Sequence, residues 1–516
     1  MEAENIYLQV IETRKGSKGT YHQDTPSSVA RLGLVYMAGE PLLSEERELI
    51  IRLSNRIENN NQMSEEDMIQ IGKLCNHKTM KLWLELTRDK GKVTEEVVKA
   101  AVGNERKGYE VMKLLLEKRG EEIRITEEVV KSVVENLFCG YEIMKLLFEE
   151  RGKEITITEE FLKAAVENRF SGCELMALLL EKRDEEIKIT EEILKATAEN
   201  LYSGDAIIKL LFERRGEEII ITTEIVKAAV ENSRKGYEVL EVLYEKRGEE
   251  IIITEEILKA TASNPYGEKI IGLILKKQGK EVIITEGIMR TAAENRYQGW
   301  EIIRLLLEKR GKEIIITEGI IKAAIGNDSC GKEIIMFLFE KREEESMITE
   351  EVLKAAASNH YNGQEIIMFL LEKQGKGVIV TEGMIKTAME NTRYGKEIII
   401  NLLKRQGKDV EYTEEILKAA ASNPYGKYIM EFILEKRGKE IIITGDVLKA
   451  AASNHCGENI IGLMLEKRGK EIIITEDVLK AAASNRRGEK IIGLILKKRG
   501  KEVIVTEEIL KAAIRN

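Results

Sequence analysis

One line of sequence returns along most of this chain at an almost constant interval. The segment ITEEVLKAAASN, residues 348–359, recurs nearly unchanged as VTEEVVKAAVGN from Val93 and as ITEDVLKAAASN from Ile474. The threonine of this line is spaced by 31 or 32 residues throughout, at Thr94, Thr126, Thr158, Thr190, Thr222, Thr254, Thr285, Thr317, Thr349, Thr381, Thr413, Thr444, Thr475 and Thr506. Self-similarity at such a period is the signature of repeat architectures. The 516 residues therefore measure copies of one unit rather than separate domains.

The first half of each unit carries the signals of a helix start. In the unit at residues 349–380, Thr349 can accept a hydrogen bond from a first-turn amide, and the two glutamates after it suit the positive end of the helix dipole. Val352, Leu353 and Ala356 fall on one helix face. Asn359 is expected to end this helix in the left-handed conformation.

The second half of the unit predicts another helix and a connector. An apolar stripe over Gln364 to Gln374 favours a second helix, which Gly375 is expected to end. The β-branched stretch after it, KGVIV here and KEIII in other copies, suits an extended link. One such pair cannot bury both apolar faces, whereas stacked pairs can. We therefore expect a mainly α fold, a right-handed α-solenoid of 31–32-residue helix-turn-helix repeats with short extended links.

Composition limits the classes of partner. Charged residues make up 33% of the chain with both signs interspersed, and the net charge is −9, which disfavours nucleic acid and anionic membranes as partners. Apolar runs are much shorter than the roughly 20 residues of a membrane-spanning helix. The start MEAENIYLQV has no secretory pattern, and five scattered cysteines do not suggest a disulfide framework. We expect a cytoplasmic protein with no membrane partner.

The repeat resembles a known family. The segment GYEVMKLLLEKRGEEI, from Gly108 to Ile123, with VVKAAVGN before it, is similar to the ankyrin consensus of a small-residue helix, a glycine and an E-V-V-x-L-L-L helix. The likeness covers residues 93–516, as thirteen full repeats from Thr94 to Val505 and a terminal half-repeat. The chain departs from the ankyrin pattern in its TEEV or TEEI start and in the extended EIIIT segment where ankyrin repeats form a β-hairpin finger.

The first ninety residues are written differently. AENIYLQVIETRK and HQDTPSSVARLGLVYMAG resemble the tetratricopeptide repeats of fungal receptor-like proteins, and the likeness is carried by Ala3, Leu8, Glu12, Arg14, Asp24, Thr25, Leu32, Tyr36 and Gly39. We expect a tetratricopeptide-like helix pair at residues 1–40. Residues 41–92 hold degenerate copies that begin with serine, such as MSEEDMIQIGKLCN, and are expected to form a transition or N-terminal cap.

Together these two parts resemble the C-terminal sensor region of fungal NOD-like receptors of the STAND type. That resemblance implies ligand sensing in non-self recognition. In those families a nucleotide-binding module precedes the repeats, but no G-x-x-x-x-G-K-[ST] loop occurs in this sequence. A nucleotide-driven switch is therefore not assigned to this chain.

No constellation for catalysis stands out. The four histidines, His22, His77, His360 and His455, are far apart in a linear array. The adjacent pair His455 and Cys456 supplies two ligands and cannot complete a tetrahedral zinc site. The glutamates recur at equivalent positions in every copy, which is typical of solvated faces and helix starts. We expect no enzymatic activity, no metal and no cofactor.

The copies differ most in the turn between the two helices. Between a near-constant asparagine and a glycine the turns read ERK, LFC, RFS, LYS, SRK, PY, RYQ, DSC, HYN, TRY, PY, HC and RR along the chain. Aromatic and arginine side chains are enriched there, as at binding hot spots. The candidate partner-binding residues are Arg106, Phe138, Arg169, Phe170, Tyr202, Arg234, Tyr266, Arg296, Tyr297, Tyr361, Arg393, Tyr394, Tyr425 and Arg486.

Two interpretations of these turns stay open at this stage. Stacked tips could form a recognition ladder, or exposed turns could simply tolerate change. Aromatics just after the glycine, at Tyr109, Tyr141, Tyr237 and Trp300, are expected to pack at the start of the second helix. The sequence favours a non-enzymatic scaffold that recognises a protein ligand. The alternative is a helical-repeat protein that reads single-stranded RNA with stacked aromatics and arginines.

Overall fold

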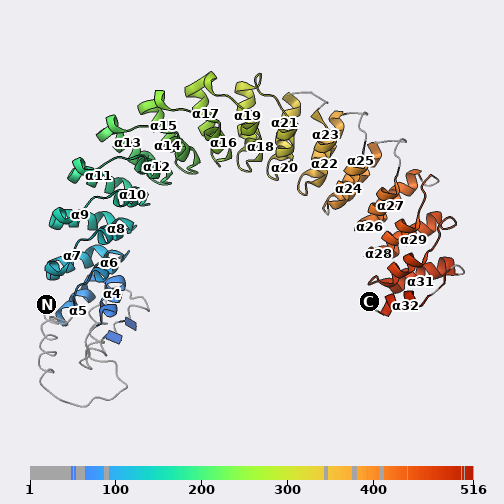
Figure 1. The fold of residues 1–516 in the computed structure, drawn as a ribbon, viewed down its shortest axis with the longest axis horizontal. Coiled ribbons are helices and arrows are strands. Elements are labelled where there is room, and N and C mark those ends of the chain that lie inside the picture. The colour runs from blue at the N-terminus through green and yellow to red at the C-terminus, as the bar shows by residue number, and fades with distance from the viewer. Residues whose placement is uncertain are drawn as a thin grey trace, which may run out of the picture. The chain divides into compact units, whose positions relative to one another are not determined.

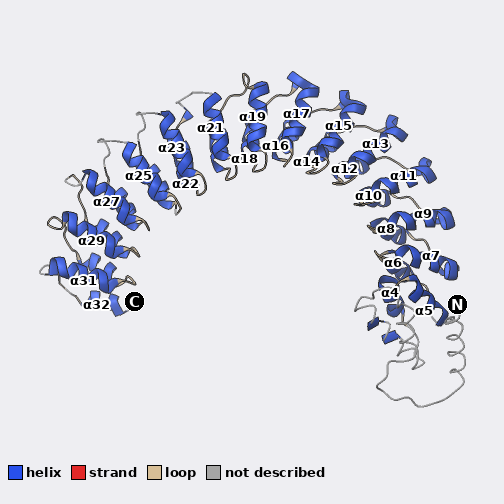
Figure 2. Cartoon of the chain, turned by 180° about the vertical axis from the view of Figure 1, so that it is seen from behind, coloured by secondary structure: helices blue, strands red, loops and turns tan. Residues whose placement is uncertain are grey.

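The computed structural model describes residues 48–49, 52–53, 64–86, 92–341, 347–374, 380–391, 393–405, 412–437, 440–500, 503–504 and 506–514. The tetratricopeptide-like pair expected at residues 1–40 and the glycine expected to end a helix at 375 lie outside them. In this part of the chain the structure contains helices and loops and no strand (Figure 2). Contacts divide the chain into two compact units, Met1–Val242 and Leu243–Asn516, which are described separately.

Unit 1 contains the first set of helix pairs (Figure 1). Its first helices are α4 (Glu65–Leu74), α6 (Glu95–Val102), α8 (Glu127–Glu135), α10 (Glu159–Glu167), α12 (Glu191–Glu199) and α14 (Thr223–Glu231). Its second helices are α5 (His77–Leu86), α7 (Gly108–Arg119), α9 (Gly140–Arg151), α11 (Gly172–Arg183) and α13 (Gly204–Arg215), and the unit boundary falls within α15 (Gly236–Arg247).

Unit 2 continues the same alternation. Its first helices are α16 (Glu255–Ser263), α18 (Glu286–Glu294), α20 (Glu318–Gly326), α22 (Glu350–Ser358), α24 (Glu382–Glu390), α26 (Glu414–Ser422), α28 (Gly445–Ser453), α30 (Glu476–Ala483) and α32 (Glu507–Ile514). Its second helices are α17 (Gly267–Gln278), α19 (Gly299–Arg310), α21 (Gly331–Lys341), α23 (Gly363–Gln374), α25 (Gly395–Arg405), α27 (Gly426–Arg437), α29 (Gly457–Arg468) and α31 (Gly488–Arg499).

Within each unit the helices form two layers that share one continuous core. First helices pack on the first helices of the neighbouring repeats, as α8 does on α6 and α10, and second helices pack likewise, as α9 does on α7 and α11. In α22 the buried residues are Val352, Leu353, Ala356 and Ala357, which is the face predicted from the sequence. The expected α-solenoid of helix-turn-helix repeats is confirmed.

The link between repeats contains a turn that the sequence pattern did not indicate. In unit 1 the second helices α7, α9, α11 and α13 are each followed by a short 3₁₀ helix, η1 (Gly120–Glu122), η2 (Gly152–Glu154), η3 (Asp184–Glu186) and η4 (Gly216–Glu218), and in unit 2 η5 (Gly248–Glu250) and η6 (Gly279–Glu281) follow α15 and α17. The residue after each turn is extended, as at Ile123 with φ −79° and ψ 128°. The link is thus a 3₁₀ turn followed by the predicted extended stretch.

The recurring threonine both caps its own helix and joins it to the preceding repeat. The Oγ1 of Thr349 accepts a hydrogen bond from the Val352 N–H at 3.3 Å and donates to Glu318 of the previous repeat at 2.9 Å. Thr381 donates in the same way to Glu350 at 2.6 Å. Thr94 and Thr475 make no side-chain cap bond, so the predicted cap holds for most of the described copies. Hydrogen bonds from the threonine of one repeat to the first glutamate of the preceding repeat thus recur along each unit, and we call them the threonine ladder.

Arginine side chains at the C-terminal ends of the second helices form a second ladder of contacts between repeats, which we call the arginine ladder. The guanidinium of Arg151 donates to the carbonyl oxygens of Gly120 at 2.9 Å and Ile123 at 3.2 Å, one repeat earlier, and forms an ion pair with Glu154. In unit 2 Arg310 donates to the Gly279 carbonyl at 2.8 Å. The arginine therefore ties the end of one helix to the preceding link, which explains why EKRGEE and EKRGKE recur.

The glutamates of the threonine ladder predict an acid-sensitive stability. Lys354 and then Thr381 hold the pKa of Glu350 below its ordinary value of 4.5, and Lys386 and then Thr413 do the same for the pKa of Glu382. A lowered carboxyl pKa adds stability that is present above the ordinary value and is lost as pH falls through the folded-state value. We expect the urea midpoint of the native chain to fall as pH drops below about 4.5.

A double variant checks this assignment. Glu350→Gln with Glu382→Gln keeps an acceptor for each threonine but removes the titrating charge, so its urea midpoint should depend less steeply on pH below about 4.5 than that of the native chain. Equal slopes for the two proteins would assign the acid sensitivity to other carboxylates.

Candidate ligand-binding surface

Each turn between the two helices is held by the side chain of its asparagine. In unit 1 the Oδ1 of Asn136 accepts hydrogen bonds from the N–H groups of Phe138 at 3.0 Å and Cys139 at 2.9 Å. Its Nδ2 donates to the carbonyl oxygens of Val102 at 2.7 Å and Asn104 at 3.4 Å in the preceding repeat. One buried carboxamide thus shapes the turn and fixes its position on the neighbouring repeat.

This arrangement corrects the expectation of a left-handed helix end. Asn359 has φ −69° and ψ 119°, an extended backbone conformation, and its Nδ2 donates to the Ile325 carbonyl at 2.6 Å. The extended backbone directs the asparagine side chain toward the preceding repeat. A left-handed helix end, by contrast, would not need asparagine in particular. The recurrence of asparagine rather than glycine at this position was the available signal for such a role.

The turns come in two lengths, which place their side chains differently. In a three-residue turn such as LFC, Phe138 lies one residue before the N-cap residue Cys139 of α9. In the two-residue turn PY, Tyr266 is itself the N-cap residue of α17, and its N–H donates to Asn264 at 2.7 Å. We call the second residue of the longer turn the tip.

In unit 1 three consecutive tips form an aromatic ladder, in which Phe138 and Phe170 are exposed and Tyr202 is half-buried. The ring centroids of Phe138 and Phe170 are 5.7 Å apart, and those of Phe170 and Tyr202 are 6.4 Å apart. The Phe138 side chain is 63% exposed and that of Phe170 is 54% exposed, although large aromatics are usually well covered. The structure thus brings together three candidates from three successive repeats.

Arginines from the same turns lie against these rings. The Arg169 guanidinium is 4.3 Å from the Tyr202 centroid and 5.2 Å from that of Phe170, and Arg234 is 4.8 Å from Tyr202. These distances are typical of cation–π contacts. We call Phe138, Arg169, Phe170, Tyr202 and Arg234 the tip ladder. Arg106 is exposed on the turn before it.

The candidates of unit 2 are less connected in the described residues. Tyr266, Tyr297, Tyr361 and Tyr425 are exposed, and so are Arg296, Arg393 and Arg486. The Arg393 guanidinium is 5.9 Å from the Tyr361 ring and 5.3 Å from the half-buried Tyr394 ring. Arg296 pairs instead with Asp328 at 3.4 Å. These contacts join pairs of turns rather than a row of tips.

The sequence argument missed one aromatic in unit 2. Tyr428 lies in the first turn of α27, is 50% exposed, and has the Lys396 ammonium 4.4 Å from its ring. It stands two residues after the glycine, where most copies have glutamate, and that exchange was the available signal. By contrast Trp300, predicted to pack, is half-buried and meets Phe337 with ring centroids 6.4 Å apart.

The described residues hold neither an activated thiol nor a cluster of metal ligands. Burial raises the pKa of the Cys139, Cys173 and Cys330 thiols above the ordinary value, which disfavours the nucleophilic thiolate. No group of three His, Cys, Asp or Glu side chains in this part of the chain is placed to hold a metal ion. None of the described helices combines the length and apolar character that a membrane crossing requires.

Stacked helix pairs with constant inter-repeat contacts and variable exposed turns define the class of helical-repeat scaffolds. The model of one repeat family matches most of the chain, and the chain belongs to this family, described as "Domain of unknown function (DUF7104)". The matched residues are 82–112, 114–144, 146–176, 178–207, 210–239, 242–270, 273–302, 305–335, 337–367, 369–398, 402–430, 433–460, 463–491 and 494–516. The segment 114–144 runs from the second half of α7 through α8 to the start of α9.

Comparisons with other known proteins add little. No curated protein matches the chain. Two solved structures of the pentatricopeptide repeat protein PPR10 in complex with an 18-nt psaJ RNA element, one of them a cysteine-to-serine variant, are similar at 9% sequence identity with a TM-score of 0.27. The similarity covers 95% of this chain and 89% of each of those chains. A TM-score of this size does not establish a shared function.

Proposed function

We propose that this chain is a non-enzymatic scaffold that binds a protein ligand through the tips of its helix-helix turns. The observation that carries the proposal is the tip ladder of unit 1, where Phe138, Phe170 and Tyr202 form a continuous row with two exposed rings and one half-buried ring. Aromatic and arginine side chains dominate the energetics of protein interfaces. The backbone of each tip is fixed by a buried asparagine, so little order has to be gained on binding.

The charges around the tip ladder indicate the kind of protein segment it suits. Arg106, Lys107, Arg169, Arg234 and Lys235 come from the same turns in a chain whose net charge is −9. Glu105 of the first turn and Asp205, which pairs with Lys235 at 3.3 Å, offset two of these five cations. The remaining excess of positive charge favours a ligand segment that combines acidic residues with apolar ones.

Single-stranded RNA is the second candidate, because the tips recur once per repeat and the arginines Arg169 and Arg234 lie over aromatic rings of the tip ladder. Two observations favour the protein ligand. Adjacent rings already contact each other at 5.7 Å and 6.4 Å, so a base has no room between them, and both Arg169 and Arg234 occupy positions over the Tyr202 ring. The negative net charge also opposes the phosphate attraction on which RNA binding depends.

A triple variant tests the proposal. Phe138→Ser, Phe170→Ser and Tyr202→Ser remove two exposed aromatic rings and one half-buried ring that all lie outside the buried core, so circular dichroism should match that of the native chain. A protein captured by the native chain should bind the variant at least about tenfold more weakly in titration calorimetry. Lys163→Ser, an exposed change on α10 of the same unit, away from the turns and the links, is the control and should bind like the native chain.

Two other outcomes would contradict the protein-ligand proposal. Equal affinity of the native chain and the triple variant for the captured protein would show that the turns are tolerated loops. Salt-dependent binding of polyuridylate that the triple variant loses would favour the RNA alternative.

A role in fungal non-self recognition is a finer proposal and rests on the resemblance to NOD-like receptors alone. It requires that ligand binding by the repeats be coupled to a nucleotide-dependent switch on the same polypeptide or on a partner. Isolation of the ligand with the native chain and the triple variant would test it, since a ligand from the same organism's own housekeeping machinery would contradict a non-self role.

A further inference from the structure

Several links between repeats of unit 2 carry a highly exposed isoleucine. Ile283 is 75% exposed and Ile315 is 78% exposed, whereas the preceding residues Val282 and Ile314 are buried. The same position is exposed in two runs of three successive repeats. Within unit 2 the runs are Ile252, Ile283 and Ile315, and Ile442, Ile473 and Ile504, and the equivalent Ile220 of unit 1 is exposed as well. We call the first run the isoleucine ridge.

The fold does not need isoleucine at this position. In three links of unit 1 the equivalent exposed residues are Arg124, Thr156 and Lys188, and in the fourth it is Ile220. These links have the same extended conformation after the 3₁₀ turn, with or without isoleucine. Threonine would satisfy the preference of an extended segment for β-branched side chains without exposing an aliphatic group. A row of exposed aliphatic side chains that polar residues can replace points to an interaction surface.

The ridge is bracketed by carboxylates. Each isoleucine follows a glutamate by two residues and precedes another by three, namely Glu250 and Glu255, Glu281 and Glu286, and Glu313 and Glu318. Arg310 and Lys259 pair with Glu313 and Glu255 and offset part of this charge. Arg247 likewise pairs with Glu250. Taken together, the segments 247–256, 280–286 and 310–318 hold eight acidic and four basic residues, and in the third of them the charges balance. The surface is therefore an apolar row with acidic margins.

The repeat spacing matches one particular kind of ligand. Neighbouring helix layers are about 9 Å apart, so successive ridge positions are separated by about that distance. Seven residues of an α-helix rise about 10.5 Å. A helix lying along the ridge would present an apolar residue to each isoleucine once every two turns, and basic residues beside that seam would face the glutamates.

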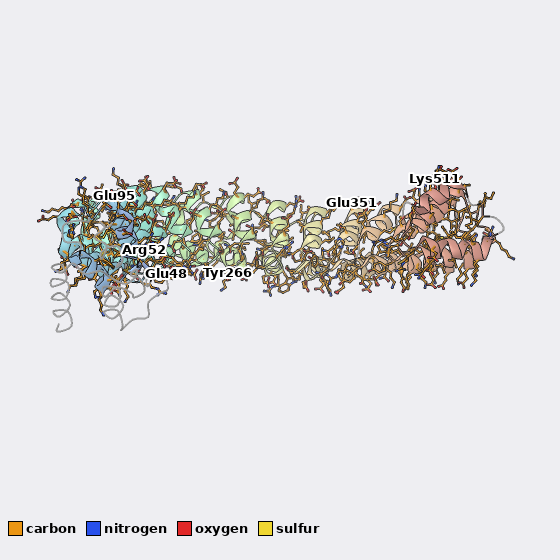
Figure 3. All side chains as sticks on the ribbon, turned by 90° about the horizontal axis from the view of Figure 1, so that it is seen from below. Glu48, Arg52, Glu95, Tyr266, Glu351 and Lys511 are labelled. Atoms are coloured by element: carbon orange, nitrogen blue, oxygen red, sulfur yellow. The ribbon has the colours of Figure 1, made fainter. Side chains whose placement is uncertain are left out.

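We propose that the isoleucine ridge binds an amphipathic α-helix of a partner protein, with an apolar seam at heptad spacing and lysine or arginine on both flanks. A second copy of this chain fits less well, because apposed ridges would bring the two sets of carboxylates together. The ridge lies at the link end of the repeats, and the tips lie at the turn end. In Figure 3 the turn residue Tyr266 and the helix-start residue Glu351 of unit 2 lie on opposite edges. This surface is therefore separate from that of the proposed function.

The test uses a defined peptide and a variant for which the chain itself provides the precedent. The probe is a fluorescein-labelled helical peptide of about 22 residues, with leucine at every seventh position and lysine on both sides of that seam. The variant carries Ile252→Thr, Ile283→Thr and Ile315→Thr, the residue found at the equivalent position 156. We expect saturable binding to the full native chain and an affinity at least about tenfold lower for the threonine variant.

Three controls make the result specific. A peptide with glutamate in place of lysine and a scrambled peptide should both bind more weakly, and the Tyr266→Ser, Tyr297→Ser variant on the opposite edge should bind the probe like the native chain. Equal binding of the probe by the native chain and the threonine variant, or of the scrambled peptide and the probe, would overturn the proposal. Sedimentation that detects a native dimer and a monomeric threonine variant would also overturn it and identify a second copy as the occupant.

Discussion

Replacing Gly331 by alanine is expected to destabilise the array, while the same change at Gly326, five residues earlier, is expected to stabilise it slightly. A Cβ at Gly331, the first residue of α21, would lie 2.2 Å from the carbonyl oxygen of Ala324. That oxygen belongs to the backbone of α20, so the two helices would have to move apart. Overpacking of this kind costs about 3 kcal/mol.

Gly326 provides the matched control. It is the last residue of α20, and a Cβ there meets nothing within 4 Å. Alanine restricts the unfolded chain and suits a helix better, which adds up to about 1 kcal/mol of stability. Urea midpoints of the two variants should therefore shift in opposite directions from the native value. If both variants shifted the urea midpoint by the same amount in the same direction, close helix packing would not require the glycine that begins each second helix.

Replacing Asn327 by alanine is the second change for which a large effect is expected. Its Nδ2 donates to the carbonyl oxygens of Ala293 at 2.8 Å and Asn295 at 2.9 Å, and its Oδ1 accepts from Ser329 at 3.0 Å and Cys330 at 3.1 Å. The residue is 1% exposed, so water cannot easily replace these bonds. Each buried group left unpaired costs about 1–3 kcal/mol, and a total loss of about 4 kcal/mol is expected.

Native-state hydrogen exchange is the appropriate measurement for this variant, because long repeat arrays need not unfold as one cooperative unit. Protection should fall most in α18, α20 and the turn between α20 and α21. Ser329→Ala, at the tip of the same turn, keeps the backbone donor that Asn327 uses and should leave protection unchanged. Native protection in the Asn327→Ala variant would mean that the asparagine contacts contribute little to stability.

The helices could be predicted because their signals are local in the sequence. Features that depend on hydrogen bonds between repeats could not be predicted. Thr349 and Val352 could be placed from the sequence because a helix cap and an apolar face depend on residues three or four positions apart. The role of Asn359 could not, because its partner is the Ile325 carbonyl, 34 residues earlier. The arginine ladder was missed for the same reason, since Arg151 reaches back to Gly120.

The candidate surface was predicted in part. Phe138, Phe170 and Tyr202 occupy the same place in equal turns, so stacking in successive repeats follows from the period. The turn PY at Tyr266 is one residue shorter, which moves its aromatic to the N-cap and away from the row of tips. The exposure of Ile283 was not predicted either, because a run of three similar β-branched residues does not reveal which of them faces outward.

The asparagine contacts also bear on how such a chain can change in length. Every bridging asparagine carboxamide described donates toward the N-terminal side, to backbone carbonyl groups of the preceding repeat. Those carbonyl groups are present whatever the turn sequence of that repeat. In unit 1 the first described donor, Asn104, finds these acceptors at Gly72 and Cys75, in a unit that begins with serine instead of threonine. Duplication or deletion of one whole repeat within such a run therefore leaves every asparagine donor with acceptors in the repeat before it. Recombination between near-identical copies can lengthen or shorten the array and exchange its tips without leaving a buried amide unpaired.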